Sequence, residues 1–248
     1  MKNTNSKIFA KKIRANSLRM VSISNSSHIG SCLSVADILA VLFTNILKIF
    51  PKDPKNINRD RLIFSKGHAS AIYYAALAES GFFDVKKLKN YCNNNSNLFG
   101  HVTKNNTPGV EFSTGSLGHG LPVASGIAFS LKNKKRKNKV FCIMSDGECD
   151  EGSTWESALF SSHHKLNNLT VIIDHNKIQS FGRVSKILKL NPFIKKWKSF
   201  NWKVKEVDGH SHSDLFNNLI RQQQNKPQVI IAHTVKGKGV PFMENKLL

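Results

Sequence analysis

The expected fold is decided by one stretch near the middle of the chain, Val140-Phe141-Cys142-Ile143-Met144-Ser145-Asp146-Gly147-Glu148-Cys149-Asp150-Glu151-Gly152. Its first five residues form a short apolar run, which is typical of a buried strand. The residues after Gly152 predict a helix, capped by Ser153 with Glu156 as its capping-box partner. Asp146 therefore stands between a strand and a helix, at the kind of strand end where open α/β sheets bind ligands.

A second apolar run, residues 169–174, predicts a neighbouring strand that delivers Asn176 to the same edge. Carboxylate and amide oxygens are hard ligands, and Mg2+ takes about six oxygens, usually one or two protein carboxylates with phosphates and water. Asp146 and Asn176 together therefore predict a metal–diphosphate site. The oxygen ligands alone do not distinguish Mg2+ from Ca2+ or Mn2+.

Strand and helix patterns alternate along the 248 residues, of which 40% are apolar. Further strands are expected over 61–65, 202–207 and 229–233. Helices are expected over residues 7–20, 34–49, 123–131 and 214–223, and a further helix is expected to follow Ser70 and run to Ala78. The helix over 34–49 is expected to begin with a capping box from Ser34 to Asp37. This alternation predicts one α/β domain over 1–248, a three-layer, doubly wound, mostly parallel sheet.

Several classes of protein are not expected from the composition. No apolar stretch reaches the roughly 20 residues of a membrane span, and the N-terminal lysines have no apolar run behind them that would make a secretory signal. We therefore expect a cytoplasmic protein with no membrane partner. None of the four cysteines forms a C-x-x-C pair, which indicates reduced thiols and no zinc site.

The formal net charge of +21 raises the question of a polyanionic partner. The charge is spread along the chain, and lysine, asparagine, isoleucine and serine are abundant throughout, as in proteins from AT-rich genomes. Only residues 132–139 form a dense basic run, and that run contains no aromatic residue that could stack on bases. We do not expect nucleic acid as a partner.

Two further features point to an anionic ligand. Glycines at 115, 118 and 120 precede the expected helix over 123–131, and such a loop lets backbone N–H groups approach a phosphate. Four histidines, His28, His68, His101 and His210, each lie in a loop close to a glycine. A single loop histidine is usually a solvated surface residue, but four at strand ends that share one sheet edge could bind hydroxyls and phosphates and shuttle protons.

In this order the motifs resemble the N-terminal, diphosphate-binding half of transketolase, particularly the separately encoded N-terminal subunit of split transketolases. The resemblance covers nearly the whole chain. It is carried by Ser65-Lys66-Gly67-His68, Thr114-Gly115-Ser116-Leu117-Gly118, Asp146-Gly147 with Asn176 thirty positions later, and Val207-Asp208-Gly209-His210. The family motif usually begins Gly-Asp-Gly, so the turn here must accommodate the Cβ of Ser145.

The resemblance implies a thiamine diphosphate-binding fold and a role for each matching residue. Asp146, Asn176 and the backbone carbonyl of Ile178 would hold Mg2+. The residues implied in cofactor binding are Gly115 and Leu117 through their backbone, Gly147 through its N–H, His68 and His210 at the diphosphate and thiazolium, and Glu151. The implied catalytic set is His28 and His101, which would bind donor hydroxyls, with His68, His210 and Glu151. Glu151 and Glu156 also match acidic residues at the family's subunit interface.

The implied activity is transfer of a two-carbon ketol unit from a ketose phosphate to an aldose phosphate, dependent on thiamine diphosphate and Mg2+. The pyrimidine-binding and C-terminal domains are expected on a partner chain, the C-terminal transketolase subunit, in a complex of two of each subunit. Two alternatives stay open: half of another thiamine diphosphate enzyme, 1-deoxyxylulose-phosphate-synthase-like or acting on other sugars, and a non-catalytic relic or basic binding module. The intact Asp146, Asn176 and histidines favour an enzyme.

Overall fold

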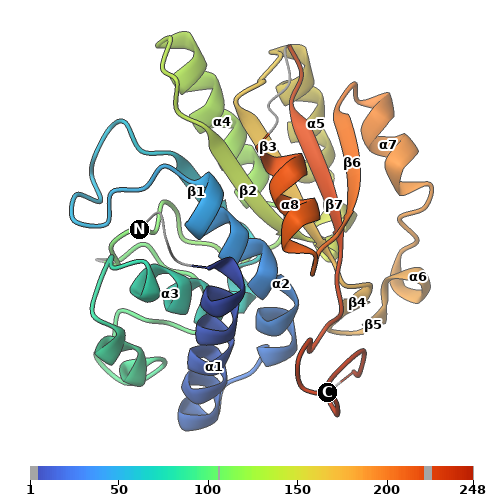
Figure 1. The fold of residues 1–248 in the computed structure, drawn as a ribbon. Helices are drawn as coiled ribbons and strands as arrows, with labels where there is room; N and C mark the ends of the chain where they lie inside the picture. Colours follow the sequence, from blue (N-terminus) through green and yellow to red (C-terminus); the bar gives the residue numbers. More distant parts are fainter. Residues whose placement is uncertain (1–4, 106, 221–224, 248) are drawn as a thin grey trace.

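The computed structural model describes residues 5–105, 107–220 and 225–247 (Figure 1). Its centre is a five-stranded sheet in the order β1-β2-β3-β7-β6, and every neighbouring pair in this sheet is parallel. The strands are β1 (Arg61–Phe64), β2 (Val140–Ser145), β3 (Leu169–His175), β7 (Gln228–His233) and β6 (Lys203–Asp208). A separate two-stranded antiparallel hairpin consists of β4 (Ile178–Gln179) and β5 (Gly182–Arg183). The expected parallel α/β sheet is confirmed.

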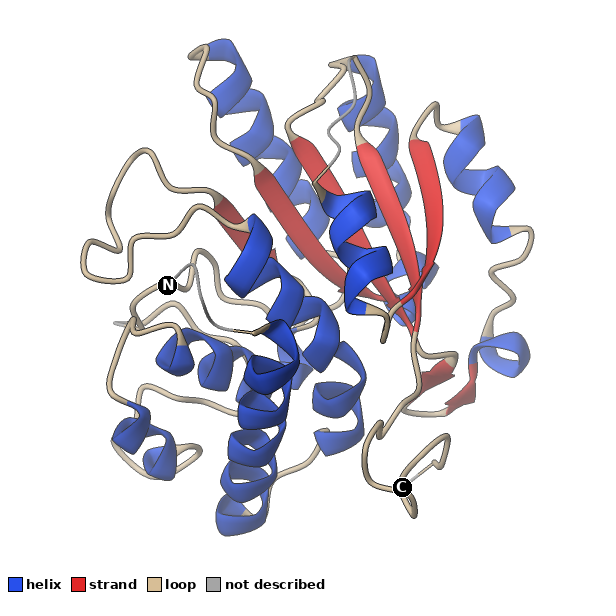
Figure 2. Ribbon diagram, viewed as in Figure 1, coloured by secondary structure: helices blue, strands red, loops and turns tan. Residues whose placement is uncertain are grey.

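Helices cover both faces of the sheet (Figure 2). Alternate residues of β3 show the two faces: Ile172 packs into one buried apolar cluster, and Val171 packs into the other. The first cluster includes residues of α1 (Ser6–Ser24), α2 (Ile29–Val41), α3 (Ser70–Glu79) and α8 (His212–Leu219). The second includes residues of α4 (Gly120–Asn133), α5 (Gly152–His163) and α7 (Phe193–Ser199), while α6 is the short helix Val184–Ile187. The three-layer arrangement follows from this division.

The register of the central strands determines where the site forms. β2 pairs with β3 so that Ser145 lies opposite Asp174, and β3 pairs with β7 so that His175 lies opposite His233. Because these strands are parallel, the residues that follow them leave the sheet at one edge. Asp146 and Asn176 therefore come off adjacent strands side by side, as the sequence predicted.

Both predicted capping boxes are wrong, because each helix begins before the serine that was expected to cap it. Helix α2 begins at Ile29, so Ser34 lies inside it, and the Ser34 hydroxyl donates to Asp174 Oδ2 at 2.6 Å. Helix α5 begins at Gly152, and the Ser153 hydroxyl donates to the Gly118 carbonyl at 2.8 Å. A capping serine accepts a backbone N–H with its oxygen, whereas both hydroxyls here donate to groups distant in sequence. The expected helix over 214–223 corresponds to α8, and its positions 221–223 lie outside the described residues.

One helical segment has the length and composition of a membrane span, contrary to the expectation from sequence. It covers Ile29–Ile46, which is α2 followed by a π-helical turn over Leu42–Ile46. This segment is 72% buried within the protein, and Val35, Ile38 and Leu39 are fully enclosed. A helix that is mostly buried in a protein core can be apolar on nearly every face, so hydropathy alone does not separate it from a membrane span.

Candidate functional site

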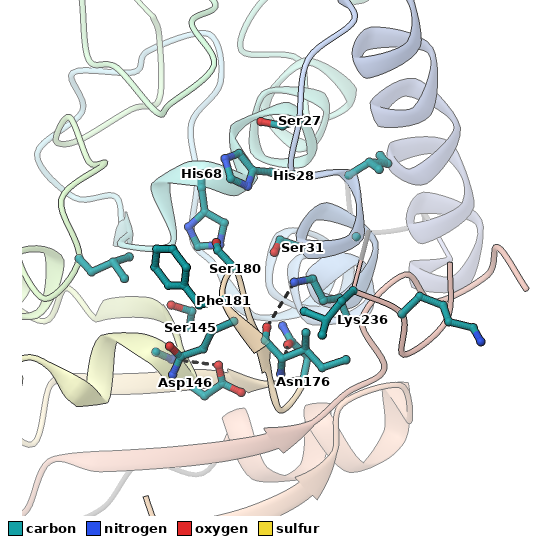
Figure 3. Close-up of a pocket in the computed structure, with 18 of the residues that line it drawn as sticks. Ser27, His28, Ser31, His68, Ser145, Asp146, Asn176, Ser180, Phe181 and Lys236 are labelled. Carbon is teal, nitrogen blue, oxygen red and sulfur yellow. Dashed lines mark hydrogen bonds between the residues drawn. The ribbon is translucent and has the colours of Figure 1, made fainter. Parts of the chain in front are cut away.

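A cavity of about 450 Å3 opens at the carboxyl edge of the sheet (Figure 3). All of the residues proposed for the site except two line it: His28, His68, His101, Gly115, Leu117, Asp146, Gly147, Asn176 and Ile178. They come from the turn before α2, the turn after β1, the long loop that holds His101, the glycine loop before α4 and the ends of β2 and β3. The two exceptions are Glu151 and His210.

The floor of the cavity carries the oxygen ligands. The Asp146 side chain is 2% exposed, its Oδ1 accepts from the Gly147 N–H at 2.9 Å, and its Oδ2 accepts from the Lys177 N–H at 2.7 Å. These two contacts tie the carboxylate to the turns after both central strands. The Asn176 Oδ1 accepts from the Ile178 N–H at 3.1 Å, which orients the amide at the same edge. Each oxygen retains a further lone pair for a cation.

This donor set fits a divalent cation only when the cation brings other ligands. Among the described residues, no group of three or more His, Cys, Asp or Glu side chains could hold a metal ion. Of the described residues that line the cavity, Asp146 alone carries a carboxylate, and the amide of Asn176 and the carbonyl of Ile178 line the same cavity. Mg2+ is commonly bound by one or two carboxylates together with phosphate oxygens. The arrangement suits a metal that arrives with a diphosphate.

Three imidazoles gather in the cavity. The ring centroids of His28 and His68 lie 5.4 Å apart, and those of His28 and His101 lie 5.9 Å apart. Burial, followed by the positive charge of Lys66, lowers the pKa of His68 well below its usual value. Burial, followed by the proximity of His101, also lowers the pKa of His28. His28 and His68 are therefore neutral near pH 7, and a neutral imidazole can both donate to and accept from a hydroxyl.

His28 adopts an unusual backbone conformation that places its ring in the cavity. Its φ of 71° lies in the left-handed region, which non-glycine residues seldom occupy. The His28 carbonyl accepts from the N–H groups of Ser31 and Cys32, at 3.1 and 3.2 Å, and so begins α2. Strained residues of this kind persist where the surroundings hold them, often at functional sites.

A buried glutamate, to which the sequence reasoning assigned no role, connects the metal turn with the glycine loop. Glu148 is fully buried, and burial raises the pKa of its carboxyl group. Its Oε1 accepts from the Ser65 hydroxyl and from the Gly118 N–H, the latter at 3.4 Å, and its Oε2 accepts from the Ser145 N–H at 2.9 Å. Glu148 thus joins the ends of β1 and β2 to the loop that carries Gly115.

Ser145 fits the position where a glycine was expected. Its φ of −84° and ψ of 161° are ordinary extended values, which any residue can adopt. The turn therefore requires no left-handed residue before Asp146, and the Cβ of Ser145 is accommodated without strain.

Two lysines also belong to the site and were missed by the sequence reasoning. The ammonium of Lys66 is fully buried and pairs with Asp174, and it donates to the Ser31 carbonyl at 2.8 Å. Lys236 lines the cavity, where its Nζ lies 3.3 Å from the carbonyl oxygen of Ile178 (Figure 3). The signal in the sequence was a lysine beside glycine at a strand end, in Lys66-Gly67 and Lys236-Gly237.

His210 is not among the residues that the structure brings together. It follows β6, and its ring lies against α2, with Nδ1 2.8 Å from Asp37 Oδ2 and Nε2 accepting from the Val235 N–H at 2.9 Å. The expectation that four histidines converge therefore holds for three. The reason is the strand order, because β6 is the edge strand beyond β7 and its loop turns toward α2.

Glu151 and Glu156 lie outside the cavity as well. Glu151 precedes the first residue of α5 and is exposed, and Glu156 is exposed on the same helix. This placement leaves both carboxylates open to a partner, and their interface role stays a prediction.

Comparison with known proteins relates this chain to one family over nearly its whole length. A family model described as "Transketolase, thiamine diphosphate binding domain" matches residues 5–247. An apulose-4-phosphate transketolase subunit from Actinobacillus succinogenes is 44% identical, over 88% of this chain and 80% of that protein. The 6-deoxy-6-sulfo-D-fructose transketolase subunit SqwG of a Clostridium species is 36% identical, over 96% of this chain and 87% of that protein.

Solved structures give the same result for the fold. The crystal structure of transketolase from Campylobacter jejuni superposes with a TM-score of 0.89 at 35% identity. The superposition covers 95% of this chain and 38% of that chain.

Proposed function

This chain belongs to the transketolase family through its N-terminal thiamine diphosphate-binding domain, and from that premise we propose that it is one subunit of a two-chain transketolase. The proposed reaction is transfer of a two-carbon ketol unit from a ketose phosphate to an aldose phosphate. The observation that carries the proposal is one cavity in which the oxygen ligands of Asp146 and Asn176 lie beside three imidazoles and the ammonium of Lys236.

The residues around the floor of the cavity would hold the cofactor. Asp146, Asn176 and the carbonyl of Ile178 would bind Mg2+, and the Gly147 N–H, the Lys236 ammonium and the glycine loop would face the diphosphate. Burial lowers the pKa of Lys236, and the nearby Lys66 lowers it further. A bound diphosphate would favour the charged form of Lys236. Thiamine diphosphate, when bound, supplies the electron sink for breaking and forming the carbon–carbon bond.

The histidines of this chain would bind and orient the sugar. His28 and His68 are neutral near pH 7 for the reasons given above, so each can donate one hydrogen bond and accept another. Together with His101 they form a cluster of imidazoles that lines the cavity and is suited to sugar hydroxyls. The same groups can take up or release a proton at a hydroxyl oxygen as it reacts.

A complementary subunit is part of the proposal. Two relatives that are named as transketolase subunits are matched over 80 and 87% of their length, whereas human transketolase is matched over 38% of its length. The turn between β4 and β5 also carries Phe181, which lines the cavity and is 93% exposed. An aromatic side chain exposed at the rim of a site is typical of a surface that a partner covers. We propose that this partner carries the pyrimidine-binding and C-terminal domains, with two copies of each subunit.

A second candidate differs in the sugar. Two relatives are named for apulose-4-phosphate and for 6-deoxy-6-sulfo-D-fructose. These names favour testing ketoses other than the common pentose phosphates as donors for this chain.

The proposal is tested by co-expressing the chain with a complementary transketolase subunit encoded beside it. Ketol transfer is measured with and without thiamine diphosphate and Mg2+, over pentose phosphates and the two sugars named above. We expect activity only with both chains and both cofactors, and its loss in Asp146→Ala. Asp53→Ala, which removes an exposed carboxylate in a distant loop, serves as the control and should retain activity. Full activity in Asp146→Ala would contradict the assignment.

A further inference from the structure

We propose that His210 is a positioning residue that holds the backbone of Val235, so that the next residue, Lys236, presents its ammonium group to the diphosphate. The inference rests on the proposed function, because it assigns a residue that supports Lys236 at the same diphosphate site. It replaces the expectation that His210 contacts the cofactor directly.

The two nitrogens of the His210 ring have different partners. Nε2 accepts from the Val235 N–H at 2.9 Å, and Nδ1 lies 2.8 Å from Asp37 Oδ2. A nitrogen that accepts an N–H carries no proton, so the ring is the neutral tautomer with its proton on Nδ1. The imidazole thus bridges a carboxylate on α2 and a backbone amide that follows β7.

Asp37 is a rigid anchor for this bridge. Arg14 of α1 binds it with both terminal nitrogens, Nη1 at 2.9 Å from Oδ1 and Nη2 at 2.6 Å from Oδ2. Burial alone would raise the pKa of Asp37, but hydrogen bonds from His210, His212 and Arg14 hold it well below the usual range. The carboxylate is therefore charged throughout the neutral range and keeps the His210 proton on Nδ1.

The turn that carries Lys236 is held on both sides. The Val235 N–H before it is bound by His210, and the Gly237 N–H after it donates to the Gly30 carbonyl at 3.0 Å. Between these two points the Lys236 side chain enters the cavity and reaches the Ile178 carbonyl at 3.3 Å. Without the His210 acceptor, the Val235 amide loses its partner and the backbone next to Lys236 gains freedom. The ammonium would then spend less time at the diphosphate.

His212 provides a matched control in the same network. Its Nε2 lies 3.0 Å from Asp37 Oδ1, and its Nδ1 lies 2.7 Å from the Ser6 hydroxyl. The side chains of His210 and His212 are 15% and 12% exposed. Both histidines therefore share one carboxylate and similar burial, but only His210 binds the turn beside Lys236.

The test uses the full chain and inorganic pyrophosphate with Mg2+, titrated by calorimetry, so that neither a partner nor turnover is needed. Replacing His210 by alanine should weaken pyrophosphate binding about tenfold, the usual scale for removing a group that orients a ligand-binding residue. His212→Ala should bind as tightly as the wild type. His210→Gln, which keeps an amide oxygen as acceptor, should recover part of the loss.

A double-mutant cycle separates positioning from general structural damage. Lys236→Ala should weaken binding by at least as much as His210→Ala, and the double variant should bind no more weakly than Lys236→Ala alone. Additive losses, or equal losses in His210→Ala and His212→Ala, would overturn the positioning role and leave the proposed function intact. Failure of the wild-type chain to bind pyrophosphate would overturn both.

Discussion

The buried ion pair of Lys66 and Asp174 allows a quantitative test of how the site is held together. Both side chains are fully enclosed, and Asp174 also accepts hydrogen bonds from the hydroxyls of Ser34 and Thr234. The pair joins the end of β1 to the end of β3. Lys66→Met keeps most of the side-chain volume but leaves a buried carboxylate without its cation. Breaking a buried pair in this way costs about 3–5 kcal/mol in the free energy of unfolding at neutral pH.

The pH dependence of that loss has a defined sign. In the wild type, burial alone would raise the pKa of Asp174, but the Lys66 charge and the hydrogen bonds lower it overall. The stabilisation is therefore present above the unfolded pKa of about 3.9 and is lost as pH falls through the folded pKa. In Lys66→Met burial dominates, so the folded pKa of Asp174 is raised. The stability of the variant then falls as pH rises through that value, and the deficit grows from about pH 4 toward neutrality.

The assay is urea unfolding, followed by tryptophan fluorescence at several pH values between 4 and about 7.5. Lys52→Met, in an exposed loop, is the control and should change stability by less than about 0.5 kcal/mol. Lys66→Met with Asp174→Asn, which removes both charges, should recover part of the loss at neutral pH. A deficit that does not vary with pH, or a double variant that loses the sum of the two single losses, would refute the reasoning.

Three further outcomes follow from the structure. A Cβ at Gly120 would overlap the side chain of Ser65, whereas a Cβ at Gly126 of the same helix meets nothing. Thermal unfolding should show Gly120→Ala destabilised by about 1–3 kcal/mol and Gly126→Ala stabilised by about 0.5–1 kcal/mol, and the reverse order would contradict the packing. The NMR signals of the His68 ring should stay at their neutral positions as pH falls through 6.5, and stability should fall below that pH because only the unfolded chain takes up the proton. A midpoint near 6.5 would contradict this. Phe181→Ser should weaken association with the complementary subunit more than about tenfold in a surface-binding assay, and unchanged affinity would remove this side chain from the interface.

Local errors in the predicted fold have a common cause. Ser34 and Ser153 each begin a sequence that satisfies a capping pattern, yet α2 and α5 both begin before these serines. A pattern of four neighbouring residues does not show where the first turn of a helix lies in the folded chain. Glu148 was overlooked because its partners Ser65 and Gly118 lie 83 and 30 positions away, and only folding brings them together.

The sequence by itself determined the parallel sheet and the core of the site. Buried parallel strands must be short, continuous apolar runs, and the runs before Asp146 and Asn176 required both side chains to leave the sheet at one edge. Only the tertiary structure decided where the side chain of His210 lies. In the sequence His210 resembles His28 and His68, because each lies in a loop close to a glycine. The order β3-β7-β6 puts its loop beyond β7, against Asp37, so that it binds the backbone beside Lys236 instead of lining the cavity. Strand order depends on which apolar faces pack together across the whole chain, and no local pattern contains that information.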